Sequence, residues 1–261
     1  MAESGRPIRP VSATVSGVIE LWRRSLAHSW LPATLVALLW TGLLAHLLLL
    51  LDPQDDLLRL ATQLQELVFA PSFAYALLAV TALSVLPYCA ITACIHATAT
   101  GARVAGAGLP LALRVFPGAV AGAAVFLFLT SAGTMLLIVP GVYLWGMWQL
   151  WIVVIVVEGC GPLAALARSW QLSRGSWWHS VTLVTVISIL SMVPVMLFVL
   201  IVPWLILPLG LSDAQALIAN LIGLSLASIL VLPLVPAALV AVYLSLCSNQ
   251  AGTAGTAGKA G

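Results

Sequence analysis

Residues 181–207 read VTLVTVISILSMVPVMLFVLIVPWLIL, 27 consecutive positions without a charged side chain. A helix needs about 20 predominantly apolar residues to cross the hydrocarbon core of a bilayer. Backbone N–H and C=O groups find no water there, so such a segment crosses as an α-helix with its hydrogen bonds made internally. This stretch places the chain among α-helical membrane proteins.

Five further apolar runs, bounded by charged residues, Pro or Gly, flank this one. The six predicted spans cover residues 30–51, 72–98, 117–139, 141–158, 181–207 and 215–246. Pro140-Gly141 predicts a tight turn between the third and fourth spans. We therefore predict an all-α polytopic membrane protein with one six-helix domain over residues 12–247. Residues 1–11 are predicted to be disordered, and 248–261, rich in Ala, Gly and Thr, to form a flexible tail.

The composition excludes other classes of protein. Of 261 residues, 62% are hydrophobic and 7% are charged, against roughly a quarter charged in a soluble domain. The net charge of +2 is too small for the phosphate neutralisation on which nucleic-acid binding depends. A soluble globule and a nucleic-acid partner are both excluded.

The basic residues indicate the orientation. With the N-terminus in the cytoplasm, nine of the ten Lys and Arg residues lie inside and only Arg59 lies outside. Cytoplasmic loops carry such an excess, so both termini are predicted to be cytoplasmic. Segment 52–71, with leucines among charges, is expected to be an amphipathic surface helix on the far side.

Two segments carry an apolar stripe with basic residues beside it. Residues 14–27 and 162–174 place apolar side chains at the same offsets, and each precedes a long span. We predict two amphipathic helices at the cytoplasmic interface. Pro162 at the start and Gly175 at the end of the second are the usual helix boundaries.

A weak internal repeat accompanies these segments. Trp22, Ser25 and Trp30 have the spacing of Trp170, Ser173 and Trp178. With a third copy near 110–114, the chain would consist of three parallel modules, each an interfacial helix followed by a hairpin. Chance matches in a sequence rich in Leu, Val and Ala are the alternative.

Residues 158–179 are the most informative loop, since they combine a carboxylate at the end of a span with Arg and Trp residues. Guanidinium and indole groups at this depth are typical of a membrane-interface belt. They are also suited to anionic lipid headgroups or to a protein partner. Glu158 is expected to pair with Arg168 or Arg174. The candidate binding residues are Glu158, Arg168, Trp170, Arg174, Trp177 and Trp178, with Arg23 and Arg24 as the matching set near the N-terminus.

Small residues at four-residue spacing predict close helix packing. They are Gly118 and Gly122 in the third span, and Ala219, Gly223 and Ala227 in the sixth. We expect them to pack within the bundle, with a homo-oligomer contact as the alternative.

Three tryptophans recur along the fourth span. Trp145, Trp148 and Trp151 are expected to form one aromatic face against lipid or a neighbouring helix, with a ligand cage as the alternative.

The sequence contains no pattern that predicts catalysis. It has no GxSxG or HExxH motif, no paired carboxylates and no phosphate-binding Gly loop. Cys94 and His96 are too few for a closed metal site. We expect neither enzymatic activity, nor a cofactor, nor a bound metal.

The order of residues 139–178 resembles a known family. Val139-Pro-Gly-Val-Tyr-Leu-Trp145, Glu158, and Arg168-Ser-Trp170 through Trp177-Trp178 resemble the YciC-type inner-membrane proteins. They are also similar to the membrane domain fused to some bacterial glycerophosphodiester phosphodiesterases. The resemblance implies a bacterial inner-membrane module without the hydrolase domain. Gly146-Met147-Trp148 stands where members of this family often carry an Arg.

The functional hypothesis is a non-catalytic module that binds membrane lipids, in particular anionic phospholipid, and translocates amphiphiles. Two alternatives stay open. One is an accessory or assembly subunit of a larger membrane complex. The other is a small-molecule carrier without ion coupling, which would need a polar cavity.

Overall fold

A computed structural model describes residues 11–50, 57–102, 108–136, 138–206, 208, 210 and 212–257. Within these ranges the secondary structure is helical. The helices are α1 (Val11–Leu49), α2 (Leu57–Phe69), α3 (Pro71–Thr100), α4 (Gly108–Leu136), α5 (Ile138–Trp148), α6 (Trp151–Glu158), α7 (Pro162–Ser173), α8 (Trp177–Ile206), α9 (Asp213–Val231) and α10 (Leu234–Ala257).

Six helical stretches are long and apolar enough to cross a membrane. They are Val15–Leu49, Pro71–Thr100, Gly108–Leu136, Val139–Glu158, Trp177–Leu205 and Gln215–Ser248. The predicted all-α fold class with six spans is confirmed. The fourth stretch runs through α5 and α6, and the sixth runs through α9 and α10.

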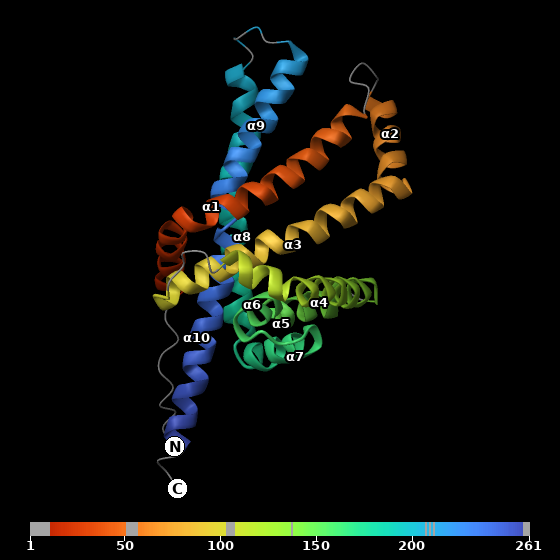
Figure 1. The fold of residues 1–261 in the computed structure, drawn as a ribbon. Coiled ribbons are helices and arrows are strands. Elements are labelled where there is room, and N and C mark those ends of the chain that lie inside the picture. The colour runs from red at the N-terminus through yellow and green to blue at the C-terminus, as the bar shows by residue number, and fades with distance from the viewer. Residues whose placement is uncertain are drawn as a thin grey trace.

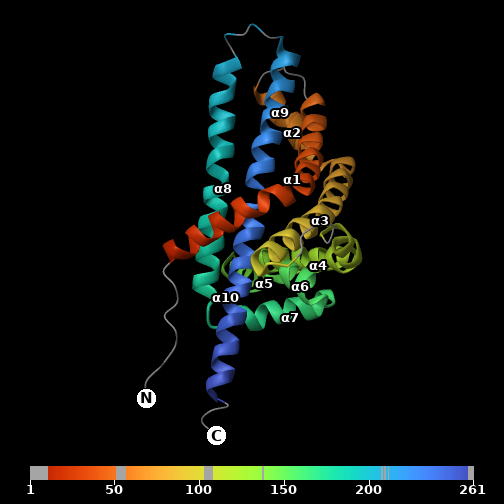
Figure 2. The same ribbon diagram turned by 60° about the vertical axis from the view of Figure 1, so that its left-hand side comes forward.

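The helices give the molecule two distinct ends. α7 and the C-terminal half of α10 lie at one end, whereas α2 and the facing ends of α8 and α9 lie at the other (Figure 1; Figure 2). α6 is in the core, where residues 151–156 are all buried and contact α3, α4, α7 and α10.

The predicted interfacial helix at 14–27 is not a separate element. It continues into the first span as a single helix, α1, with Pro32 inside it, and Figure 2 shows that this helix bends along its length. Proline is a common cause of such bends. Where the predicted interfacial helix at 14–27 meets the predicted span at 30–51, Ser29 donates to the carbonyl of Ser25 at 3.0 Å. No helix-terminating glycine occurs there.

The turn between the third and fourth spans lies earlier than predicted. α4 ends at Leu136 and α5 begins at Ile138, so Pro140 and Gly141 lie inside the first turn of α5, where proline is tolerated because its missing N–H has no helical partner. Gly141 instead permits a close helix crossing: a Cβ there would lie 2.7 Å from Thr134 Cα.

The predicted span 141–158 is interrupted. Gln149 and Leu150 form a turn between α5 and α6. The Met147 carbonyl belongs to the last turn of α5, where carbonyls lack a partner in the helix. Ser169 of α7, which is fully buried, donates to this oxygen at 2.9 Å. A side chain outside the span therefore supplies the hydrogen bond that this carbonyl lacks within its own helix.

The remaining predicted boundaries compare as follows. Segment 52–71 contains α2, while residues 51–56 lie outside the described residues. α10 continues to Ala257, into the segment predicted to be a flexible tail. Residues 1–10 and 258–261 also lie outside the described part.

Candidate functional site

Glu158 is the last residue of α6 and receives two side chains from other helices. Gly159 ends the helix in the left-handed conformation, with φ +65°, which glycine adopts without strain. Glu158 Oε1 then lies 3.3 Å from Arg168 Nε on α7. The Tyr243 hydroxyl on α10 donates to the same oxygen at 3.0 Å.

Arg168 and Arg174 are the two predicted partners of Glu158, and Arg168 is the one that pairs with it. Tyr243 was not predicted, because it lies 85 positions away in an apolar run where nothing in the sequence distinguishes it. We call Glu158, Arg168, Trp170, Arg174, Trp177, Trp178 and Tyr243 the α7 site.

The tryptophans of the α7 site form one aromatic cluster with Tyr143. The ring centroid of Tyr143 lies 5.9 Å from that of Trp170 and 5.5 Å from that of Trp177. The Trp177 indole also donates to the Tyr143 carbonyl at 3.3 Å. Trp178 packs edge-on against Trp177 at 4.5 Å and remains 77% exposed. The cluster is anchored on α5 and presents one indole at the surface.

The cations of this region differ in their pairing. Arg174 follows α7 and is exposed; among the described residues it has no ion-pair partner. The same holds for Arg114 on α4, which was not a predicted site residue. Arg114 and Glu158 both line a cavity of about 510 Å³ at the end of α6. One unpaired guanidinium group, that of Arg114, therefore lines the same cavity as the Glu158 carboxylate.

The matching N-terminal set is arranged differently. Arg23 and Arg24 both pair with Glu20 on their own helix, at 3.1 and 2.7 Å. Trp22, the predicted counterpart of Trp170, donates to the Leu230 carbonyl at 2.9 Å. In the described residues no hydrogen bond or ion pair joins this set to the α7 site, so the two predicted sets are separate.

Cys160 lies beside Glu158 in the loop between α6 and α7. Burial raises the pKa of the Cys160 thiol, and the negative charge of Glu158 raises it further. Both effects disfavour the thiolate.

The predicted packing residues divide into two groups. A Cβ at Gly122 would lie 2.9 Å from the Trp151 ring, and one at Gly223 would overlap the Phe198 ring, so both glycines permit close packing. Gly118 has no such neighbour within 4 Å, so it marks no close approach within this chain, and the homo-oligomer contact stays a prediction. Ala219 and Ala227 are half-buried on α9, which contacts α1 and α8.

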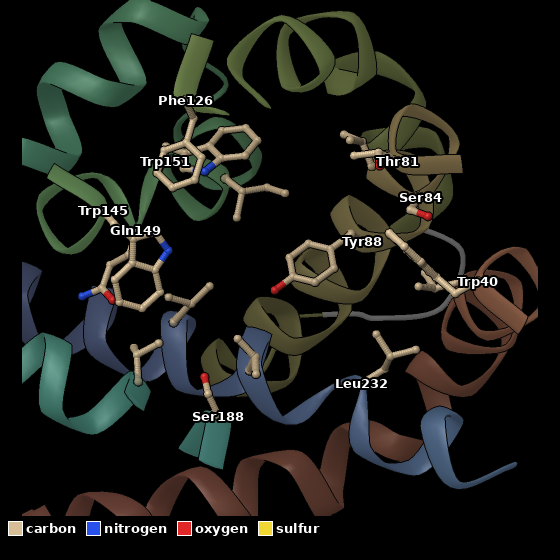
Figure 3. Close-up of a pocket in the computed structure, with 16 residues that line it drawn as sticks. Trp40, Thr81, Ser84, Tyr88, Phe126, Trp145, Gln149, Trp151, Ser188 and Leu232 are labelled. Atoms are coloured by element: carbon tan, nitrogen blue, oxygen red, sulfur yellow. The ribbon is translucent and has the colours of Figure 1, made fainter. Parts of the chain in front are cut away.

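The three tryptophans predicted to form one face of the fourth span contact two different parts of the molecule. Trp148 contacts Trp170, with ring centroids 6.1 Å apart. Trp145 and Trp151 line a cavity of about 410 Å³ on another side (Figure 3). The prediction of one shared face is wrong for Trp148, which contacts α7 and does not line the cavity that Trp145 and Trp151 share.

In the described part of the chain, no three His, Cys, Asp or Glu side chains are grouped so that they could hold a metal ion. No protein family, curated protein or solved structure matches this chain. The resemblance to the YciC-type proteins stays a prediction.

Proposed function

We propose that this multi-pass membrane protein is a non-catalytic module that binds anionic phospholipid headgroups at the α7 site. The observation that supports it most directly is the pairing state of Arg174. An exposed guanidinium without an ion-pair partner in the described residues lies close in sequence to the 77% exposed indole of Trp178.

The chemistry of these two groups suits a phospholipid. A guanidinium group binds phosphate through two parallel N–H donors and is always charged. An indole at the headgroup level places its ring against acyl chains and its N–H toward water. Arg174 and Arg114 would each offer a guanidinium group to an anionic headgroup, while Arg168 holds α7 through Glu158.

The predicted orientation supports the same role. The protein is proposed to lie in the bacterial inner membrane with both termini in the cytoplasm, so that the α7 site faces the inner leaflet. Basic segments at such a surface are attracted to anionic lipid. The common location of α7 and the end of α10 at one end of the molecule (Figure 2) agrees with this orientation.

Native mass spectrometry tests this proposal on the full chain. The protein is titrated with phosphatidylglycerol, and with phosphatidylcholine as the zwitterionic comparison. Arg174→Gln combined with Arg114→Gln removes both unpaired cations. Arg23→Gln is the matched control, because Glu20 already pairs with that cation.

We expect the double variant to bind phosphatidylglycerol about tenfold more weakly, since it loses two charge-assisted contacts. The control should bind as the wild type does. Equal affinity of the wild type and the double variant would contradict the proposal. A second protein chain at fixed stoichiometry, without lipid, would favour the accessory-subunit hypothesis instead. That hypothesis, the carrier and amphiphile translocation all stay predictions.

A further inference from the structure

The cavity beside the α5–α6 break lies in the middle of the membrane-spanning helices, away from the α7 site. Its volume is about 410 Å³, within the usual range for a small-molecule pocket. Five aromatic side chains from four of the spans form much of its wall (Figure 3): Trp40, Tyr88, Phe126, Trp145 and Trp151.

The wall of this cavity carries no charge. Asp, Glu, Lys, Arg and His are all absent from the residues that line it. A charged ligand would lose its hydration there without gaining a counter-ion, which is costly. The cavity therefore suits an uncharged and mainly apolar molecule.

Gln149 brings an amide group to this apolar wall. Its side chain is 6% exposed, and neither the amide nitrogen nor the amide oxygen has a hydrogen-bond partner in the described structure. Nearly all buried polar groups in proteins have a partner, so each exception calls for an explanation. A ligand that supplies the missing bond is one.

Further donors line the same space. The Tyr88 hydroxyl and the indole N–H groups of Trp145 and Trp151 have no hydrogen-bond partner among the residues described. Figure 3 shows Tyr88 reaching into the middle of the cavity, with its hydroxyl directed toward the side that holds Trp145 and Ser188. The Thr81 and Ser84 hydroxyls, by contrast, donate to carbonyls of their own helix at 2.7 Å.

The donors available to a ligand thus outnumber the acceptors. A phenol and two indole N–H groups call for oxygen acceptors on the ligand, because the indole N–H can only donate. Carbonyl oxygens on an apolar body meet this requirement.

The cavity is also accessible from the lipid phase. Trp40 and Trp145 line it and remain 43% and 38% exposed, in two of the candidate membrane spans. An apolar molecule dissolved in the bilayer could reach these exposed lining residues without crossing water.

We infer that this cavity binds an uncharged apolar molecule through its carbonyl oxygens, which accept hydrogen bonds from Tyr88, Gln149 and the two indoles. A quinone ring and the ester group of a glyceride share this chemistry. The inference is independent of headgroup binding at the α7 site.

The test measures the thermal unfolding midpoint of the full chain in phosphatidylcholine nanodiscs. Decylbenzoquinone and dioctanoylglycerol are the two carbonyl probes, and decylbenzene is an apolar control without an acceptor. A ligand that binds the native state raises the midpoint in a saturable way. Tyr88→Phe and Gln149→Met remove hydrogen-bonding groups at nearly constant volume. Thr81→Val is the matched control, because it removes a hydroxyl from the same wall that is already bonded.

We expect at least one carbonyl probe to raise the midpoint saturably and decylbenzene not to. Each of Tyr88→Phe and Gln149→Met should raise the half-saturating concentration about tenfold, the effect of one lost hydrogen bond, and Thr81→Val should not change it. A response to one carbonyl probe alone identifies the source of the ligand. The inference is overturned if decylbenzene acts as strongly as the carbonyl probes, if neither carbonyl probe acts, or if both variants bind unchanged.

Discussion

The Tyr243 hydroxyl donates a 3.0 Å hydrogen bond to Glu158 Oε1, although 85 positions separate the two residues. Arg168 contacts the same oxygen. One carboxylate at the end of α6 therefore joins α7 to α10, and the position of the α7 site depends on it.

Replacement of Tyr243 by Phe tests this junction. Tyr243 is 6% exposed, so the loss of its bond to a charged acceptor should cost about 1.5–3 kcal/mol of unfolding free energy. Arg168→Gln should cost less, because that ion pair is about a third exposed and exposed pairs contribute little. Unfolding in mixed micelles measures both. A larger loss for Arg168→Gln would contradict this ranking.

Ser169 and Ser173 form a matched pair on α7, since both are fully buried. Ser169 donates to the Met147 carbonyl, whereas the Ser173 hydroxyl has no partner in the described structure. We expect Ser169→Ala to lower the unfolding free energy by about 1–2 kcal/mol and Ser173→Ala to leave it unchanged or raise it. Equal losses in the two variants would mean that the Ser169 bond contributes nothing specific.

Gly122 and Gly118 are a second pair on one helix. Alanine at Gly122 meets the Trp151 ring at 2.9 Å and Ile155 at 3.1 Å, while Gly118 has open space around it. Gly118→Ala should therefore stabilise α4 by up to about 1 kcal/mol through its helix propensity. Gly122→Ala should destabilise the protein by about 1–3 kcal/mol through overpacking. Thermal unfolding of both variants decides this, and the prediction fails if they shift in the same direction.

Cys160 should react slowly with iodoacetamide at pH 8, since burial and Glu158 raise the pKa of its thiol and the thiolate is the reactive form. The alkylation rate should increase as the pH is raised above 8, because the fraction of thiolate increases. Glu158→Gln removes a negative charge, lowers the pKa and should speed alkylation at pH 8. The measurement uses a Cys247→Ser background, because Cys247 is half-buried like Cys160, whereas Cys89 and Cys94 are buried. Tyr243→Phe is the control, because it loosens the same contact without changing the charge; an equal acceleration in that variant would point to access rather than pKa.

The regular parts of the fold could be predicted from local sequence. α7 begins at Pro162 and ends just before Gly175. Proline favours the first turn of a helix and glycine favours the position after its end, so both boundaries are set by local sequence. The six apolar runs likewise predict the candidate spans, since hydropathy and length alone determine whether a helix can cross a bilayer.

The break at Gln149 and Leu150 could not be predicted in this way. Neither residue is Gly or Pro, and the run around them is apolar. The hydrogen bond to the Met147 carbonyl comes from α7. The role of Tyr243 was missed for the same reason, because pairing across helices leaves no local pattern. Arg23 and Arg24 were assigned to a lipid site by analogy with the later module, but Glu20 pairs with both.

The hydrogen bond from Ser169 to the α5–α6 break should affect the order in which the helices enter the membrane. α5 and α6, with 11 and 8 residues, are each too short to traverse about 30 Å of hydrocarbon, and an uncovered carbonyl between them is unfavourable in lipid. A nascent chain that has emerged only as far as Glu158 lacks the hydroxyl that covers this carbonyl. We expect this span to enter the bilayer stably only after α7 has been synthesised. In translocon-insertion assays on chains of increasing length, stable insertion should therefore first appear in chains that include α7 and not in chains that end at Glu158.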